Sequence, residues 1–89
     1  MLLNLLKMDL GITHHLRDEY FVKLLDSCRA EIERKGIVLD ELNDIEDAIL
    51  IADYAAWSYR KRTEDLPLSR NIQHRIRNRI LKERAKDSG

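Results

Sequence analysis

The sequence has few of the residues that break or cross-link a chain. Among its 89 residues there are three Gly, one Pro and one Cys. The single cysteine, Cys28, cannot form an internal disulfide, which excludes a disulfide-stapled scaffold and favours a reducing compartment. We expect Cys28 to be a small core residue rather than a reactive thiol. With 36% charged residues, this composition is typical of a soluble protein built from helices and few turns.

The chain also lacks long apolar runs and the common catalytic motifs. No segment approaches the ~18 apolar residues that cross a bilayer, so we expect no membrane association. The leading MLLNLLKMDLG has no basic region before its leucines, unlike a signal peptide. There is no P-loop, GxSxG or HExxH motif. The imidazoles are His14, His15 and His74, and adjacent histidines diverge on a helix. We therefore predict a protein that is not an enzyme and that has no cofactor or metal.

Two helices are predicted in the first third of the chain. A short N-terminal helix within residues 1–11, ended by Gly11, is indicated by Leu2, Leu3, Leu5 and Leu6. A longer amphipathic helix is indicated by apolar residues spaced three or four apart. These are Leu16, Tyr20, Phe21, Leu24, Leu25, Cys28 and Ile32. Thr13 is its candidate N-cap and Gly36 its candidate stop. The apolar trio at 37–39 predicts a buried connector.

The stretch from Ile45 to Arg62 predicts the helix that organises the fold. Its apolar residues cover two neighbouring faces, so it needs neighbours on most sides. The small alanines within it would let another backbone approach closely. Acidic residues precede it and basic residues end it, which matches the helix dipole. Asn43 and Glu46 stand at capping-box spacing.

A basic helix is predicted at the end of the chain. Pro67 breaks the preceding helix, and Ser69 can cap a helix over 69–86 whose apolar spine is thin. A frayed tail is expected at 87–89. Taken together, the pattern predicts one all-α domain over 1–89. It is a small bundle of about four helices around a long central apolar helix.

Charge is segregated along the chain although the net charge is zero. Residues 1–57 hold six basic and twelve acidic residues, whereas residues 58–89 hold ten basic and four acidic. Either the basic end binds a polyanion, or it meets the acidic part of another copy. Because identical subunits arranged head-to-tail bring unlike surfaces together, the split favours a homo-oligomer.

Asp53 stands inside the most apolar helix, where a carboxylate has to be paired or lie at an interface. Two alternatives stay open. We favour a pair with an arginine of the final helix, and the other is a contact with an adjacent subunit.

Several segments resemble the small head–tail connector (adaptor) proteins of tailed bacteriophages. They are IVLD at 37–40, DAILIADYAAW at 47–57, YR at 59–60, LPLSR at 66–70 and RIRNR at 75–79. The resemblance covers most of residues 16–82 and includes the layout of an early helix, a long apolar helix and a basic last helix.

The resemblance implies a structural role in the virion at the head–tail junction, after assembly in the bacterial host cytoplasm. Such proteins form a homo-oligomeric ring beneath the portal protein, extend the DNA exit channel and offer a docking surface to the next tail or stopper protein. By resemblance, one set of residues would be core or subunit contacts: Asp53, Tyr54, Trp57 and Tyr59. A second set would contact the portal, adjacent subunits or passing DNA: Arg70, Arg75, Arg77, Arg79 and Lys82.

Two other functions are compatible with the residues. One is a nucleic-acid-binding regulator that uses the basic C-terminal helix, with strong salt dependence. The base-reading candidates are only Asn71, Gln73 and Asn78, and a Pro-containing loop replaces the usual tight turn. The other is a small helical adaptor, or an antitoxin-like partner of another protein.

Overall fold

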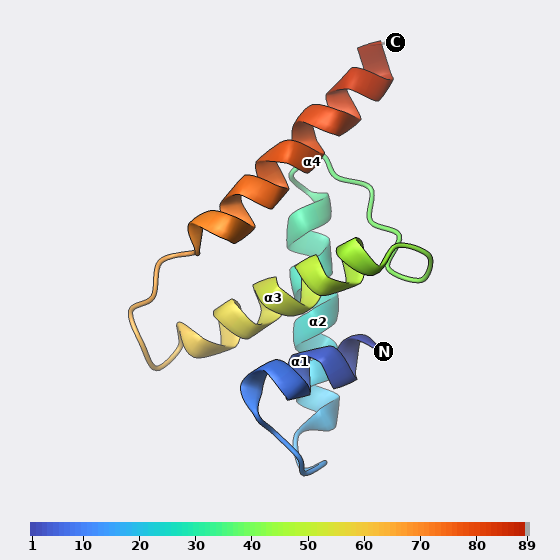
Figure 1. The fold of residues 1–89 in the computed structure, drawn as a ribbon. Helices are drawn as coiled ribbons and strands as arrows, with labels where there is room; N and C mark the ends of the chain where they lie inside the picture. The colour runs from blue at the N-terminus through green and yellow to red at the C-terminus, as the bar shows by residue number, and fades with distance from the viewer. Residues whose placement is uncertain (89) are drawn as a thin grey trace.

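Four α-helices and no strand make up residues 1–88, the part of the chain that the computed structural model describes (Figure 1). The helices are α1 (Leu2–Leu10), α2 (Asp18–Glu33), α3 (Ile45–Arg60) and α4 (Arg70–Ser88). The predicted all-α architecture with about four helices is confirmed. α4 continues through Ser88 instead of ending at residue 86, and Gly89, the rest of the expected tail, lies outside the described residues.

α3 is the central helix, and α1, α2 and α4 all pack on it. Its buried residues are Asp47, Ala48, Leu50, Ile51, Ala52, Tyr54, Ala55 and Ala56. The alanines have no long side chains to hold neighbouring backbones away, as the sequence suggests. One face near the start of α3 stays open, because Ile45 is 55% and Ile49 38% exposed. Near its start α3 is therefore only partly covered, because Ala48 is buried whereas Ile45 and Ile49 are not.

α2 supplies the largest part of the opposing core, but it begins later than the sequence predicts. Phe21 and Ile32 are fully buried, and Cys28 is 2% exposed. Burial raises the pKa of the Cys28 thiol to about 11, which suits a core residue and not a thiolate nucleophile. Leu16 is 88% exposed and Thr13 does not cap the helix, whose N-cap is Arg17. Both expectations for the start of α2 are wrong.

The helix ends follow local chemistry closely. Gly11 ends α1 with φ 72° and Gly36 follows α2 with φ 96°, a conformation that favours glycine. At the start of α3 the cap is Asp44, whose carboxylate accepts the N–H of Glu46 at 2.9 Å. The expected cap, Asn43, instead donates its side-chain amide to Asp40. Adjacent polar residues compete for one cap, and the turn geometry decides between them.

A buried lysine fastens α1 to the start of α2. Lys7 is 6% exposed, and its ammonium lies 2.7 Å from the Asp18 carboxylate. His15 Nδ1 lies 3.0 Å from the other oxygen of Asp18. The hydrogen bonds from Lys7 and His15 hold the pKa of Asp18 below its ordinary 3.8. α2 begins at Asp18, whose carboxylate binds Lys7 and His15. Leu16 lies in the turn before it and stays in solvent.

Acid should weaken this attachment. A lowered folded-state pKa means that the stability contributed by Asp18 is present above its unfolded-state pKa and is lost as the pH falls through the folded value. We expect the difference in unfolding free energy between the wild-type protein and Asp18→Asn to be constant well above pH 3.8 and to shrink below it. Urea titrations over a pH series measure the difference, and Glu19→Asn, an exposed neighbour, is the control. A pH-independent difference would show that the Asp18 charge is not involved.

Candidate functional site

α4 carries the basic cluster and is held to the rest of the protein by a short apolar contact. The Ser69 hydroxyl accepts the N–H of Ile72 at 3.2 Å, so Ser69 caps α4 as predicted. Ile72 and Ile76 are each 6% exposed and belong to the core, with Ile80 half-buried against it. Leu81 is 53% exposed. The last turns of α4 project beyond the other helices (Figure 1).

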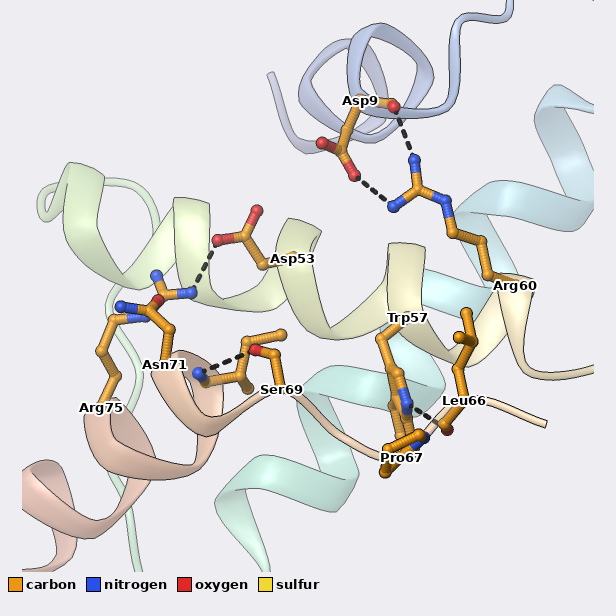
Figure 2. A pocket seen from close by; sticks show the side chains of 10 residues that line it. Asp9, Asp53, Trp57, Arg60, Leu66, Pro67, Ser69, Asn71 and Arg75 are labelled. Carbon is orange, nitrogen blue, oxygen red and sulfur yellow. Dashed lines mark hydrogen bonds and ion pairs between the residues drawn. The ribbon is translucent and has the colours of Figure 1, made fainter. Parts of the chain in front are cut away.

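Asp53 pairs with Arg75 of the last helix. Arg75 Nη2 lies 2.7 Å from Asp53 Oδ2, and the two side chains are 31% and 35% exposed (Figure 2). Of the two alternatives for Asp53, the pair within the chain is the one observed. Because solvent reaches both groups, such a pair stabilises the fold by at most about 1 kcal/mol.

Arg79 pairs with a carboxylate that is almost completely buried. Asp47 is 1% exposed and accepts both the Arg79 guanidinium and the backbone N–H of Asp40. Arg79 also donates to the carbonyl of Val38 at 2.8 Å and lies 3.6 Å from Glu83. One guanidinium therefore ties α4 to the α2–α3 connector and to the first turn of α3.

An open groove of about 390 Å³ runs between the end of α3 and the segment that leads into α4 (Figure 2). Trp57 is half-buried there, with its indole N–H donating to the Leu66 carbonyl at 3.0 Å. The Lys61 ammonium lies 4.2 Å from the centre of the Trp57 ring. At the far side Arg60 donates to the Asp9 carbonyl and lies 3.5 Å from the Asp9 carboxylate. Trp57 therefore holds the segment between α3 and α4 in place, and its side chain is only half-buried.

The two tyrosines of α3 have different surroundings. Tyr54 is 7% exposed and belongs to the core, where burial and the Glu31 carboxylate raise the pKa of its hydroxyl to about 12. Tyr59 is half-buried, with its ring 5.4 Å from that of Phe21 in an edge-to-face arrangement. Neither ring has the strongly exposed surface that a dominant subunit contact needs.

A second surface, which we call the basic groove, lies along α4 next to Lys35, which follows α2. It is an open hollow of about 430 Å³ with an apolar floor and three cations at its rim. Its residues are Lys35, Leu68, Gln73, Ile76, Arg77, Ile80, Leu81 and Arg84. In the described part of the chain, Arg70, Arg77 and Lys82 have no ion-pair partner, unlike Arg75 and Arg79. The five basic residues singled out in the sequence therefore divide into two that hold α4 and three that face solvent.

A third surface, which we call the acidic groove, lies where the start of α1 meets α2 and the α2–α3 connector. It has a volume of about 260 Å³, with an apolar lining and two carboxylates. Its residues are Met1, Leu2, Leu3, Val22, Leu25, Asp26, Glu41 and Leu42. Met1 is 65% and Leu42 88% exposed, which is unusual for large apolar side chains. Glu41 already pairs with Arg29 at 2.8 Å, so Asp26 supplies the unpaired negative charge.

Sequence reasoning missed Asp47 and the acidic groove. The signal for Asp47 was its place three and four residues before Leu50 and Ile51, which puts it on the buried side of α3. Leu42 gave no signal, because a lone leucine among acidic residues fits a buried connector equally well. Within residues 1–88, no group of three or more His, Cys, Asp or Glu side chains is placed to hold a metal ion, and no helix is long and apolar enough to span a membrane.

Comparisons with known proteins found no family model, no curated protein and no solved structure that matches this chain.

Loss of Arg79 should be far more costly than loss of a solvent-facing arginine on the same helix. Arg79→Met leaves the buried Asp47 carboxylate without its cation, and we expect a loss of roughly 2–4 kcal/mol in unfolding free energy. Arg77→Met is the matched control, with an expected change within about 0.5 kcal/mol. The double variant Arg79→Met, Asp47→Asn should recover part of the loss. Urea denaturation measures all three, and equal effects of the two arginine variants would contradict the assigned role.

Proposed function

We propose that this chain is the structural subunit of a bacteriophage head–tail connector ring. In this role the ring docks beneath the portal, extends the DNA exit channel and offers a tail attachment surface at the head–tail junction of the virion. The proposal assigns no enzymatic step and no cofactor to the chain. It starts from the resemblance of residues 37–40, 47–57 and 66–79 to such connectors.

The observation that carries the proposal is that one chain displays two unlike grooves. The basic groove on α4 has an apolar floor and a cationic rim, and the acidic groove beside α1 has an apolar lining and carboxylates. The charged side chains that border one groove are opposite in sign to those that border the other. A basic groove on one copy therefore fits an acidic groove on the next, which is a heterologous, head-to-tail contact.

A head-to-tail contact gives a ring when the rotation between neighbours closes and an open filament when it does not, so the connector proposal requires a rotation that closes. The two grooves are small, and each contact alone should be weak. Assembly is therefore expected at high protein concentration or on a portal, which would hold many copies close together and raise their effective concentration.

A mixing experiment tests the assembly geometry. The first variant, Arg77→Glu with Arg84→Glu, should disable the basic groove, and the second, Asp26→Asn with Leu42→Asn, should disable the acidic groove without giving it a charge that the first variant attracts. We expect each variant alone to stay monomeric and their mixture to stop at a heterodimer, because one intact contact remains. Sedimentation velocity measures this, and electron microscopy of the wild-type protein with its portal shows whether rings form.

The exposed positions chosen should leave thermal unfolding unchanged, which is the control for folding. Rings formed by either variant alone would contradict the assignment of the grooves. A wild-type protein that never joins a portal, at any concentration, would contradict the connector function itself.

A second candidate is a nucleic-acid-binding regulator that uses α4. It is favoured by the solvent-facing cations Arg70, Arg77 and Lys82, whose charges no carboxylate neutralises in the described residues. Arg75 and Arg79 are engaged inside the fold and are poor candidates for phosphate contacts.

This second candidate has its own test. If α4 binds duplex DNA, Arg70→Gln with Arg77→Gln should weaken binding and lower the slope of log K against log salt by about two, one for each phosphate that an arginine no longer neutralises. Lys23→Gln, an exposed change on α2, is the control. Electrophoretic mobility shifts over a salt series with operator-like and random duplexes measure the effect. Equal retention of every duplex by the variant and the wild-type protein would exclude the regulator.

A further inference from the structure

A hollow of about 360 Å³ lies at the end of the molecule where the start of α2 meets the end of α3. Arg17, Tyr59, Arg62 and Thr63 line it, and Tyr20 lies beneath both arginines. The two grooves described above share none of these residues.

The two arginines are held in place by aromatic rings. The Arg17 guanidinium carbon lies 4.6 Å from the centre of the Tyr20 ring and 5.8 Å from that of Tyr59. The Arg62 guanidinium carbon lies 5.4 Å from the centre of the same Tyr20 ring. Stacking of this kind orients a guanidinium and leaves most of its N–H groups free at the edge. Two like charges are thereby brought to one ring.

No ion pair neutralises either of these two exposed arginines among the described residues, in contrast to other arginines of the chain. Arg29, Arg75 and Arg79 each meet a carboxylate. Of the acidic residues close to them in sequence, Asp18 pairs with Lys7 and His15 and Glu19 lies near Lys23. Glu64 and Asp65 form no ion pair with either arginine among the described residues. Like charges at one site repel, so an arrangement that keeps both cations is favoured when an anion lies between them.

The tyrosine hydroxyls add donors to the site. Arg17 donates to the Tyr59 hydroxyl at 3.3 Å, and Arg62 donates to the Tyr20 hydroxyl. A hydroxyl that accepts from a cation still has its own proton to donate. The Thr63 hydroxyl is engaged with the Arg60 carbonyl and adds none. The hollow therefore offers two guanidiniums and the hydroxyl proton of Tyr59, and no carboxylate lines it.

We propose that this hollow binds a phosphate group. The tetrahedral oxyanion accepts several hydrogen bonds at once, and guanidinium forks match two of its oxygens. The shared chemistry covers a phosphodiester of a nucleic acid and a free phosphate or nucleotide. This inference stands apart from the connector proposal, because it uses different residues and needs no second copy.

A purely structural role for the arginines explains less. One guanidinium is enough to join Tyr20 to Tyr59, and Arg17 already reaches both rings. Arg62 adds a second positive charge to a contact that is complete without it. A ligand with negative charge gives Arg62 a function that bracing does not.

The test is a titration of the folded protein with inorganic phosphate, followed by amide chemical shifts at constant ionic strength with chloride as the balancing anion. We expect saturable shifts at residues 17–20 and 61–63. Arg62→Gln should weaken phosphate binding by about tenfold or more, and Tyr59→Phe, which keeps the ring, by a smaller factor. Arg77→Gln with Arg84→Gln is the matched control and should bind phosphate as the wild-type protein does.

A second arm uses short oligothymidylate as competitor to identify the source of the phosphate. Displacement of phosphate from the same amides, absent in Arg62→Gln, assigns a phosphodiester. Saturable phosphate binding that the oligonucleotide does not displace assigns free phosphate or a nucleotide. Shifts that grow without saturating, or equal affinities in the wild-type protein and Tyr59→Phe and Arg62→Gln, would overturn the site. Thermal unfolding of each variant confirms that it is folded.

Discussion

The structure depends on close approach to α3. Ala48, Ala55 and Ala56 are almost fully buried, so the backbones of α1 and α2 can pack against this helix without long side chains between them. A larger residue at any of these positions would push a neighbour outward and open the core. α1 and α2 cover two sides of α3, so α4 packs on a third side. That side carries Asp47, Leu50, Asp53 and Trp57. That side is partly polar, which decides how α4 is attached.

A helix that packs on a partly polar face needs something to fix its register. The apolar residues of α4 that touch the core, Ile72, Ile76 and Ile80, repeat every four positions, so a shift by one turn would present a similar stripe. Arg75 and Arg79 remove that ambiguity, because each meets one specific carboxylate on α3. Asp47 contributes most to this choice, since a buried charge without its partner is costly. The two ion pairs therefore act mainly by fixing the register of α4 against α3.

The sequence was sufficient to predict the helices and much of the core, because the signals for both are local. Repeats of three and four located α2 and α3, and Gly11, Gly36 and Ser69 marked ends whose chemistry needs no tertiary contact. The predicted start of α2 was wrong because Leu16 continues the apolar repeat, whereas the helix begins at Asp18, which binds a lysine eleven residues earlier. Such a long-range pair leaves no periodic trace in the sequence.

The candidate sites were less predictable for the same reason. Asp53 was singled out correctly as a paired carboxylate, but which arginines turn inward and which outward depends on the phase of α4 against α3. That phase is set by contacts that only the folded chain contains. The hollow at Arg17 and Arg62 joins residues 45 positions apart, and nothing in either local segment marks them as neighbours.

Part of the charge that is segregated along the sequence is neutralised by ion pairs within the fold. Arg60, Arg75 and Arg79 pair with carboxylates from the first 57 residues, so part of the basic excess serves as internal attachment. Of the cations that remain, Arg77 and Arg84 line the basic groove and Arg62 lines the hollow at the start of α2. Those of the basic groove border an apolar floor that includes the exposed Leu81.

A polyanion gains little from an apolar floor, whereas a protein partner buries it. The hollow at Arg17 and Arg62 has no aliphatic lining residue, and beside the Tyr59 ring it offers hydrogen-bond donors and positive charge. Physical chemistry therefore separates the two surfaces by the partner that each suits. On this reasoning the proposed partner of α4 is another polypeptide with acidic and apolar groups, and the proposed ligand of the hollow between α2 and α3 is a phosphate.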